Sequence, residues 1–114
     1  MSIKILYTDL RTVPSKLEKC VVEWQPDLTA LQVLEKALGE TLTNEVERGL
    51  KSNSREIIVS WYNESTGDVS EIGGVGTLEW HIPDDTVLTI SYENEATTQQ
   101  QVDESIKWTL EQEL

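Results

Sequence analysis

The residue best suited to general acid–base catalysis is the chain's one histidine, His81, because an imidazole titrates near neutral pH. A catalytic base also needs a nucleophile or a substrate pocket within reach, and no motif in the sequence marks either one. Pro83 and two aspartates follow His81 closely. We therefore interpret His81 as a surface or half-buried side chain beside a turn, and we predict no catalytic residue.

Three carboxylates near His81, those of Glu79, Asp84 and Asp85, are of the type that binds calcium. Calcium loops of the familiar kind place oxygen ligands at alternate positions around a central glycine and close with a glutamate. The segment Pro83-Asp84-Asp85-Thr86 lacks that spacing. A turn between strands explains it better, because aspartate side chains bond the local backbone. We predict no metal site.

Two further groups offer chemistry that the surrounding sequence does not support. The glycine-rich run Ile72-Gly73-Gly74-Val75-Gly76 lacks the Gly-Lys-Ser/Thr and the following helix of a phosphate-binding loop. Cys20 is the only cysteine, so one chain cannot form a disulfide or a cysteine-ligated zinc or iron–sulfur site. We expect Cys20 to be an inert buried thiol, and we predict no cofactor.

The net charge of −12 comes entirely from the second half of the chain. Residues 1–55 carry eight acidic and eight basic side chains, whereas residues 56–114 carry thirteen acidic side chains and one basic side chain, Lys107. A negative surface potential repels nucleic acids and anionic membranes and attracts basic proteins. We therefore expect no direct binding to nucleic acids or membranes. The alternative is that the charge only keeps the protein in solution.

The length and composition predict one folded domain. A chain of 114 residues with 38% hydrophobic residues can build one modest core. No apolar run approaches the roughly 20 residues that span a bilayer. The first residues enter a strand-like pattern without a basic leader or a long apolar segment, so we expect a cytoplasmic protein.

Alternating apolar residues predict strands at residues 3–10, 17–24, 55–62 and 87–92. The first two are joined by a turn at 11–16 and are therefore expected to form a hairpin. The chain thus supplies the strands of one sheet, with room for helices between the second and third strands.

The helices are marked by capping and by apolar spacing. Thr29 and Gln32 have the spacing of a capping box, which predicts a helix over 30–38 that ends at Gly39. A second short helix is indicated by Leu42, Val46 and Leu50, which repeat every four residues.

The segments between the third and last strands are predicted to be irregular. Residues 63–76 are expected to form a long loop, 77–82 a short mixed segment, and 83–86 a turn.

The C-terminal residues predict an acidic amphipathic helix. Thr98 and Gln101 again have capping-box spacing. An apolar stripe follows on one face, formed by Val102, Ile106, Leu110 and Leu114. Trp108 falls off that stripe, among charged residues, and is expected to be partly exposed. The stripe either packs back on its own domain, occupies a groove of a partner, or pairs with a second copy in a homodimer.

The order hairpin, helix, strand, long loop, short strand and final strand resembles the ubiquitin-like β-grasp fold over residues 3–92. The resemblance is carried by Gly76-Thr77-Leu78-Glu79-Trp80-His81-Ile82-Pro83-Asp84-Asp85-Thr86-Val87-Leu88-Thr89-Ile90. It looks like the end of that fold, where a Thr-Leu pair opens a short turn and an acidic turn precedes the closing strand.

The resemblance implies an α+β fold with a mixed four- to five-stranded sheet packed on one main helix. Residues 1–95 would form this domain, and residues 96–114 an added C-terminal helix. Conjugated members of the family act through a C-terminal Gly-Gly, whereas the only glycine pair here, Gly73-Gly74, is internal. The chain is therefore similar to the non-conjugated members, which serve as protein-binding domains or accessory subunits.

These observations predict a non-enzymatic interaction or adaptor protein that docks on a basic protein partner. The expected contacts are carboxylates of the second half together with two tryptophans as aromatic anchors: Glu79, Trp80, Asp84, Asp85, Glu93, Glu95 and Trp108. Two alternatives remain open. One is an inhibitor that mimics nucleic acid and blocks a DNA- or RNA-binding enzyme, as small viral or mobile-element proteins can. The other is a small regulatory subunit of an enzyme complex.

Overall fold

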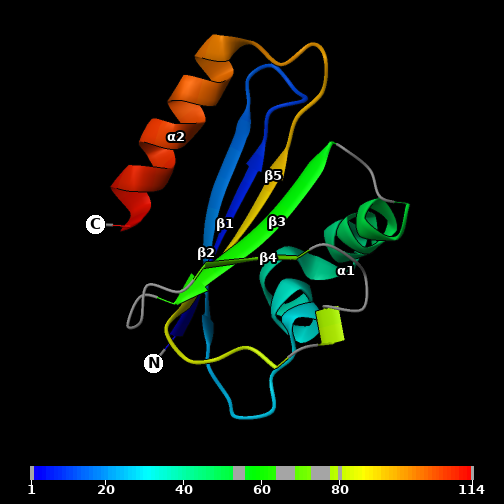
Figure 1. Cartoon of the computed structure of the whole chain (residues 1–114), viewed down its shortest axis with the longest axis vertical. Coiled ribbons are helices and arrows are strands. Elements are labelled where there is room, and N and C mark those ends of the chain that lie inside the picture. Colours follow the sequence, from blue (N-terminus) through cyan, green and yellow to red (C-terminus); the bar gives the residue numbers. More distant parts are fainter. Residues whose placement is uncertain (1, 53–55, 64–68, 73–77, 80, 114) are drawn as a thin grey trace.

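The computed structural model describes residues 2–52, 56–63, 69–72, 78–79 and 81–113. Seven elements follow in chain order: β1 (Ser2–Asp9), β2 (Lys16–Glu23), α1 (Ala30–Lys51), β3 (Ile57–Asn63), β4 (Val69–Ile72), β5 (Thr86–Tyr92) and α2 (Gln99–Glu113). The fold is therefore α+β, as predicted, with two helices flanking one sheet (Figure 1).

The five described strands form one mixed sheet in the order β2-β1-β5-β3-β4. β1 and β5 run parallel at its centre, and the other neighbouring strands are antiparallel. The predicted hairpin is confirmed, with Ile5 opposite Cys20 in the β1–β2 register. The strands that come first and last in the chain, β1 and β5, are thus neighbours in the sheet, although more than 70 residues separate them in the sequence.

The core lies between the sheet and α1. Alternate residues of β1 and β5 point to this side, where Ile5, Leu88 and Ile90 are fully buried against Val33 and Leu34 of α1. The period-2 pattern of the strands meets the helical spacing of α1, so that the two apolar faces bury one another. Burial of apolar surface at this interface is the main stabilising contribution to the domain.

The predicted start and break of α1 are both confirmed. Gln32 donates its backbone N–H to Thr29 Oγ1 over 3.3 Å, and Thr29 N–H donates to Gln32 Oε1 over 3.0 Å. At Gly39 the backbone has φ of 83°, so the two predicted helices are one element with a non-helical residue inside it. Gly49 brings the second half close to β3, because a Cβ there would lie 3.1 Å from Ile57 Cγ2.

The prediction of one long loop over 63–76 is wrong in part. Residues Val69–Ile72 form the edge strand β4, with Val69 opposite Tyr62 and Ile72 opposite Val59. Four residues are too few to show an alternating pattern, and the strand is defined by its backbone pairing with β3. In the segment predicted as mixed, Leu78–Glu79 form a turn of 3₁₀ helix, and His81 makes an isolated bridge with Thr29.

A partly buried pair of salt bridges centred on Arg11 joins the β1–β2 hairpin to α1 and β5. Arg11 donates Nε–H and Nη2–H to the two oxygens of Asp9 over 3.0 and 2.8 Å, and Nη2–H to Glu45 Oε1 over 2.9 Å. Its guanidinium lies 3.9 Å from the ring centroid of Tyr92. The hydrogen bonds from Arg11 hold the pKa of Asp9 below its usual value, and burial raises the pKa of nearby Tyr7 to about 12.

Candidate functional site: a groove between α2 and the sheet

The second face of the sheet is polar where it meets α2. Leu6 and Thr8 of β1 and Thr89 and Ser91 of β5 point to this side, because they alternate with the core residues of the same strands. Thr89 also shares a hydrogen bond of 2.6 Å with Ser60 of β3. This face therefore presents mostly hydroxyl groups, with Leu6 as its apolar part.

Helix α2 is fixed to the hairpin turn at its N-terminus. The predicted capping box is present, with Gln101 N–H donating to Thr98 Oγ1 over 3.2 Å and Thr98 N–H donating to Gln101 Oε1 over 3.0 Å. The two hydrogens of Gln101 Nε2 are shared among three oxygens of the turn, namely Leu10 O at 3.1 Å, Thr12 O at 2.9 Å and Ser15 Oγ at 2.9 Å. One side chain thus caps the helix and holds it in place.

The rotation of α2 about its axis leaves two residues of its apolar stripe, Ile106 and Leu110, exposed. Ser105 is the best-buried residue of the helix, 8% exposed, whereas Ile106 is 53% and Leu110 57% exposed. At 100° per residue, the side of α2 facing the sheet is centred on Ser105, and the stripe lies beside that contact. The described part of the stripe therefore does not pack into the core of its own domain.

Trp108 lies nearer to the sheet than its charged neighbours in the sequence indicated. It is half-buried, which agrees with the expected partial exposure. Its helical position, however, is close to that of Ser105 rather than on the outermost side of α2. Trp108 therefore lies off the apolar stripe, as predicted, and beside the part of α2 that faces the sheet.

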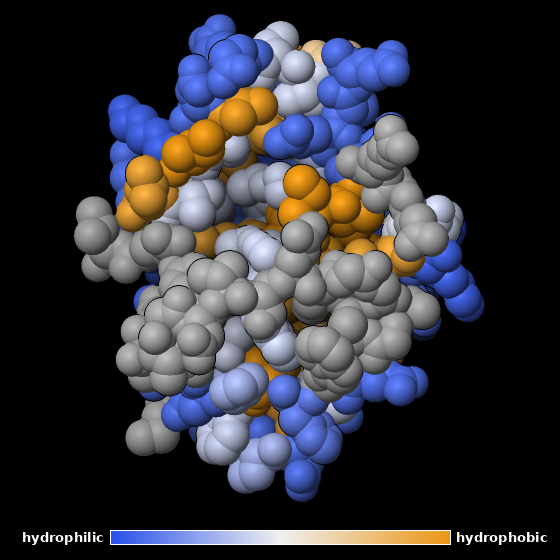
Figure 2. Space-filling view, viewed as in Figure 1, coloured by the Kyte–Doolittle hydropathy of each residue, from blue (hydrophilic) through white to orange (hydrophobic). Residues whose placement is uncertain are grey.

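The space between α2 and the sheet is a groove of about 300 Å³. Its apolar wall and polar floor are formed by Leu6, Thr8, Thr89, Ser91, Glu93, Val102, Ser105, Ile106, Thr109 and Leu110. Figure 2 shows the apolar band along α2 and the paler surface of the sheet beside it. We call this feature the α2 groove.

An acidic hollow at the end of β5 shares one lining residue with the α2 groove. Glu56, Glu93, Asn94 and Glu95 line this second hollow, so Glu93 belongs to both. Glu93 N–H donates to Glu56 O over 2.8 Å, which brings the segments flanking β3 and β5 together. Of the described residues that line the two hollows, none is a lysine or arginine.

The predicted carboxylates fall into two separate groups. Glu93 and Glu95 follow β5, whereas Asp84 and Asp85 precede it. The seven residues of β5 put about 20 Å between these groups. Glu79 is exposed on the 3₁₀ turn, and Trp80 lies outside the described residues. The structure thus brings together Glu93 and Glu95, with Glu56 beside them.

The segment 83–86 is a turn, as predicted, and its aspartates bond locally. Asp85 N–H donates to Asp84 Oδ1 over 2.9 Å, and Thr86 Oγ1 donates to Pro83 O over 2.7 Å. Asp85 has φ of 60°, which aspartate tolerates better than most side chains. Among the residues that the structure describes, no group of three or more histidine, cysteine or acidic side chains is placed to hold a metal ion.

The other candidate residues from the sequence stand apart from the α2 groove. His81 is exposed in its bridge with Thr29. Cys20 is half-buried rather than buried, because it lies in an edge strand. Its Sγ donates to Ala37 O over 3.4 Å, and burial raises the pKa of this thiol.

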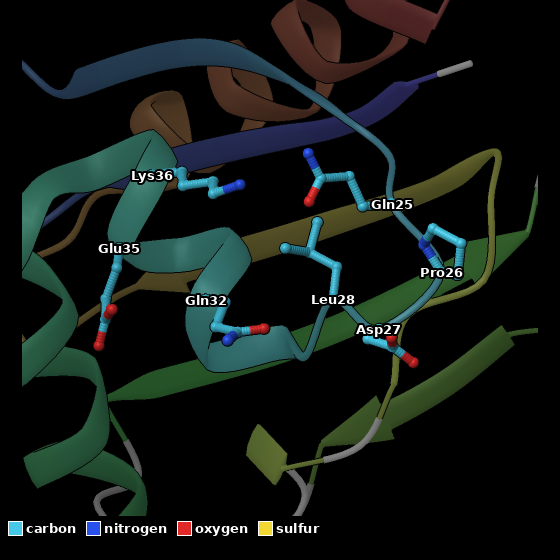
Figure 3. A pocket seen from close by; sticks show the side chains of 7 residues that line it. All are labelled: Gln25, Pro26, Asp27, Leu28, Gln32, Glu35 and Lys36. Carbon is cyan, nitrogen blue, oxygen red and sulfur yellow. The ribbon is translucent and has the colours of Figure 1, made fainter.

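A third hollow, of about 460 Å³, lies between the β2–α1 connection and the first turns of α1. Figure 3 shows its side chains, with Asp27 and Glu35 far apart and their carboxylates not converging. Gln32 is already engaged in the capping box. This hollow is therefore a polar surface depression without a convergent set of groups for a ligand.

Sequence reasoning identified Glu93, Glu95 and the amphipathic α2 but missed the groove that they border. The floor residues Leu6, Thr8 and Ser91 belong to strands whose polar side is unremarkable in the sequence. One signal was available: Ser105 and Gln101 share a side of α2, which marks a polar contact face distinct from the apolar stripe.

No helix among the described residues is long and apolar enough to cross a membrane. Comparison of the chain with family models, curated proteins and solved structures gives no match.

Proposed function

We propose that this protein is a non-enzymatic adaptor of the cytoplasm that docks on a basic protein partner through the α2 side of its sheet. The observation that carries this proposal is that an apolar groove and an acidic hollow share Glu93 as a lining residue. Apolar surface supplies binding free energy, and complementary charge raises the association rate and selects the partner. The net charge of −12 favours basic proteins over nucleic acids and anionic membranes.

We further propose that the fold is of the ubiquitin-like β-grasp type, with α2 added to it. The support is the order of elements: an opening hairpin, a helix across one face, and a last strand beside the first. The non-conjugated members that the sequence resembles are protein-binding domains or accessory subunits. Fold alone does not specify function, so the proposed docking role depends on the α2 groove.

Affinity capture with matched variants tests the docking role. Tagged wild-type protein, the double variant E93Q/E95Q and the control E35Q/E40Q are compared for partners retained from cell extract along a salt gradient. The control removes the same charge from the exposed side of α1. A basic partner released at moderate salt is expected for the wild type and the control, because salt shortens the Debye length to about 3 Å at 1 M.

The double variant is expected to release that partner earlier in the gradient. Equal retention by E93Q/E95Q and E35Q/E40Q would show that the acidic hollow plays no special part. Absence of any basic partner would contradict the docking role and leave the charge as a means of solubility.

A regulatory subunit of an enzyme complex is the second candidate, favoured by the exposed apolar residues Ile106 and Leu110. Its partner would stay bound at high salt, because an apolar interface is little affected by screening. The variant I106S/L110S would release that partner, whereas E93Q/E95Q would not. The same capture experiment therefore separates the two functions.

A further inference from the structure

The wall of the α2 groove offers uncovered apolar surface beside a buried residue of the sheet. Ile106 and Leu110 are more than half exposed, and Leu6 at the base is almost completely buried. A side chain placed between them would contact aliphatic carbon on two sides. The groove therefore favours a ligand with an aliphatic part, such as the stem of a long side chain.

Hydroxyl groups of both α2 and the sheet line the groove and offer hydrogen-bond acceptors. Thr109 Oγ1 donates to Ser105 O over 2.8 Å, Ser105 Oγ donates to Val102 O over 2.8 Å, and Thr8 Oγ1 donates to Ile90 O over 3.4 Å. These three hydroxyl hydrogens are thus directed at backbone carbonyls of the protein. The lone pairs of the three oxygens remain able to accept, so these groups favour a ligand that supplies N–H or O–H donors.

The end of the groove carries negative charge. Glu93 closes it, and Glu95 lies in the adjoining hollow. A ligand with an aliphatic stem and a cationic, donor-only head satisfies the wall, the floor and this end together. Lysine and arginine side chains have that construction, and the guanidinium of arginine matches carboxylates with two parallel hydrogen bonds.

The size of the groove fits such a side chain with an apolar neighbour. Its volume of about 300 Å³ is about twice that of a cavity known to hold benzene. The strands of the floor, β1 and β5, are each paired on both edges, so a peptide cannot bind there by adding a strand to the sheet. Binding would therefore occur through side chains.

A second copy of this chain fits the α2 groove less well than a basic ligand does. Helix α2 carries four acidic residues and one basic residue, Lys107, so two such helices packed together would repel one another. The acidic hollow at the end of the groove would add to this repulsion. Charge therefore favours a basic ligand over a homodimer.

We infer that the α2 groove binds a basic segment of the partner protein, with the stem of an arginine or lysine along Leu6 and Ile106, its cation at Glu93 and Glu95, and a neighbouring apolar side chain against Leu110. This inference rests on the proposed docking function and specifies the chemistry of its partner. It locates recognition at one groove rather than across the acidic surface as a whole.

The test uses fluorescence anisotropy with a labelled peptide of alternating leucine and arginine. The matched peptide carries citrulline, which is uncharged and close to arginine in shape, at every arginine position. The full-length protein and its I106S/L110S, E93Q/E95Q and E35Q/E40Q variants are titrated, and circular dichroism verifies that each variant is folded. Backbone amide shifts of Ser91, Glu93, Ser105 and Thr109 locate the bound peptide.

We expect about tenfold weaker binding for the citrulline peptide, for I106S/L110S and for E93Q/E95Q, which is the change that one lost interaction of ordinary strength produces. E35Q/E40Q is expected to bind like the wild type. Weakening by E93Q/E95Q without weakening by I106S/L110S would overturn the groove assignment and leave acidic docking intact. Binding that is equal for both peptides and all variants would overturn the docking function as well.

Light scattering of the protein alone supplies the remaining outcome. A monomer is expected over the working concentration range. A dimer that I106S/L110S dissociates would assign the α2 groove to a second copy and overturn the inference.

Discussion

The two faces of the sheet are built from the same strands but are covered in different ways. On the α1 side, residues such as Leu88 and Ile90 are fully buried against the helix. On the α2 side, the same strands present hydroxyls around Leu6, and the helix above them keeps Ile106 and Leu110 exposed. One face is held by apolar burial along the whole helix, whereas the other is held mainly by polar bonds at one end.

This difference separates stability from binding. Burial fixes α1, because exposing its apolar face costs free energy at every turn. Helix α2 is positioned by Gln101 and the cap at Thr98, so its apolar stripe is available to a ligand. A sheet with one sealed face and one open groove can bind a partner without disturbing its core.

The largest contrast is expected from truncating one leucine on each side. Leu34→Ala removes a fully buried side chain and is expected to lower the free energy of unfolding by about 2–5 kcal/mol. Leu110→Ala removes an exposed side chain and is expected to stay within about 0.5 kcal/mol. Urea denaturation of both variants measures this, and similar losses would show that α2 is also held by apolar burial.

The next effect concerns the ion pair that joins the hairpin to α1. Arg11→Met leaves the Asp9 carboxylate with only part of its hydrogen bonds in a buried place, and a loss of about 1–3 kcal/mol is expected. Lys16→Met is the control, because the pair of Lys16 with Glu18 is exposed and 3.7 Å long, and such pairs contribute about 0–1 kcal/mol. Denaturation that shows equal losses of unfolding free energy for Arg11→Met and Lys16→Met would contradict a larger contribution from the less exposed pair.

The pair of Asp9 with Arg11 also predicts that the stability of the protein depends on pH in the acidic range. The pKa of Asp9 is lower in the folded protein than its ordinary value, so its contribution is present above the ordinary pKa and is lost as the pH falls through the folded pKa. Stability of the wild type should therefore decline below about pH 4. Arg11→Met should decline less over that interval, and denaturation at several pH values measures the difference. A parallel decline in both proteins would exclude Asp9 as a source.

A smaller and more local effect is expected from Gln101→Glu. The new carboxylate keeps an oxygen for the cap but loses the Nε2 donor that contacts Leu10 O, Thr12 O and Ser15 Oγ. Hydrogen exchange of α2 should rise by about tenfold, corresponding to about 1.4 kcal/mol, while β1 and β5 keep their protection. Gln100→Glu, on the exposed side of the helix, is the control. Unchanged exchange would mean that α2 is held by other contacts.

Much of the fold could be predicted from the sequence, because it depends on interactions between residues that are close together in the chain. Thr29 and Gln32 meet within one helical turn, and Gly39 breaks α1 where its spacing indicated. The strand at residues 69–72 could not be predicted from the sequence, because it is defined by its backbone pairing with β3. Of the candidate site, Glu93 and Glu95 were identified from charge alone. Their separation from Asp84 and Asp85 required the direction of β5 in space.

The sequence by itself determined both helices with their caps, the strands other than β4, and the concentration of negative charge in the second half of the chain. These properties follow from local backbone bonding and from composition. Only the tertiary structure decided how α2 is rotated over the sheet. The hydrogen bonds from Gln101 reach the β1–β2 turn, 86 or more residues away, and turn Ser105 rather than Ile106 toward the sheet. This long-range polar contact helps to set how α2 lies over the sheet, and its partners in the turn cannot be identified from the pattern of α2 alone.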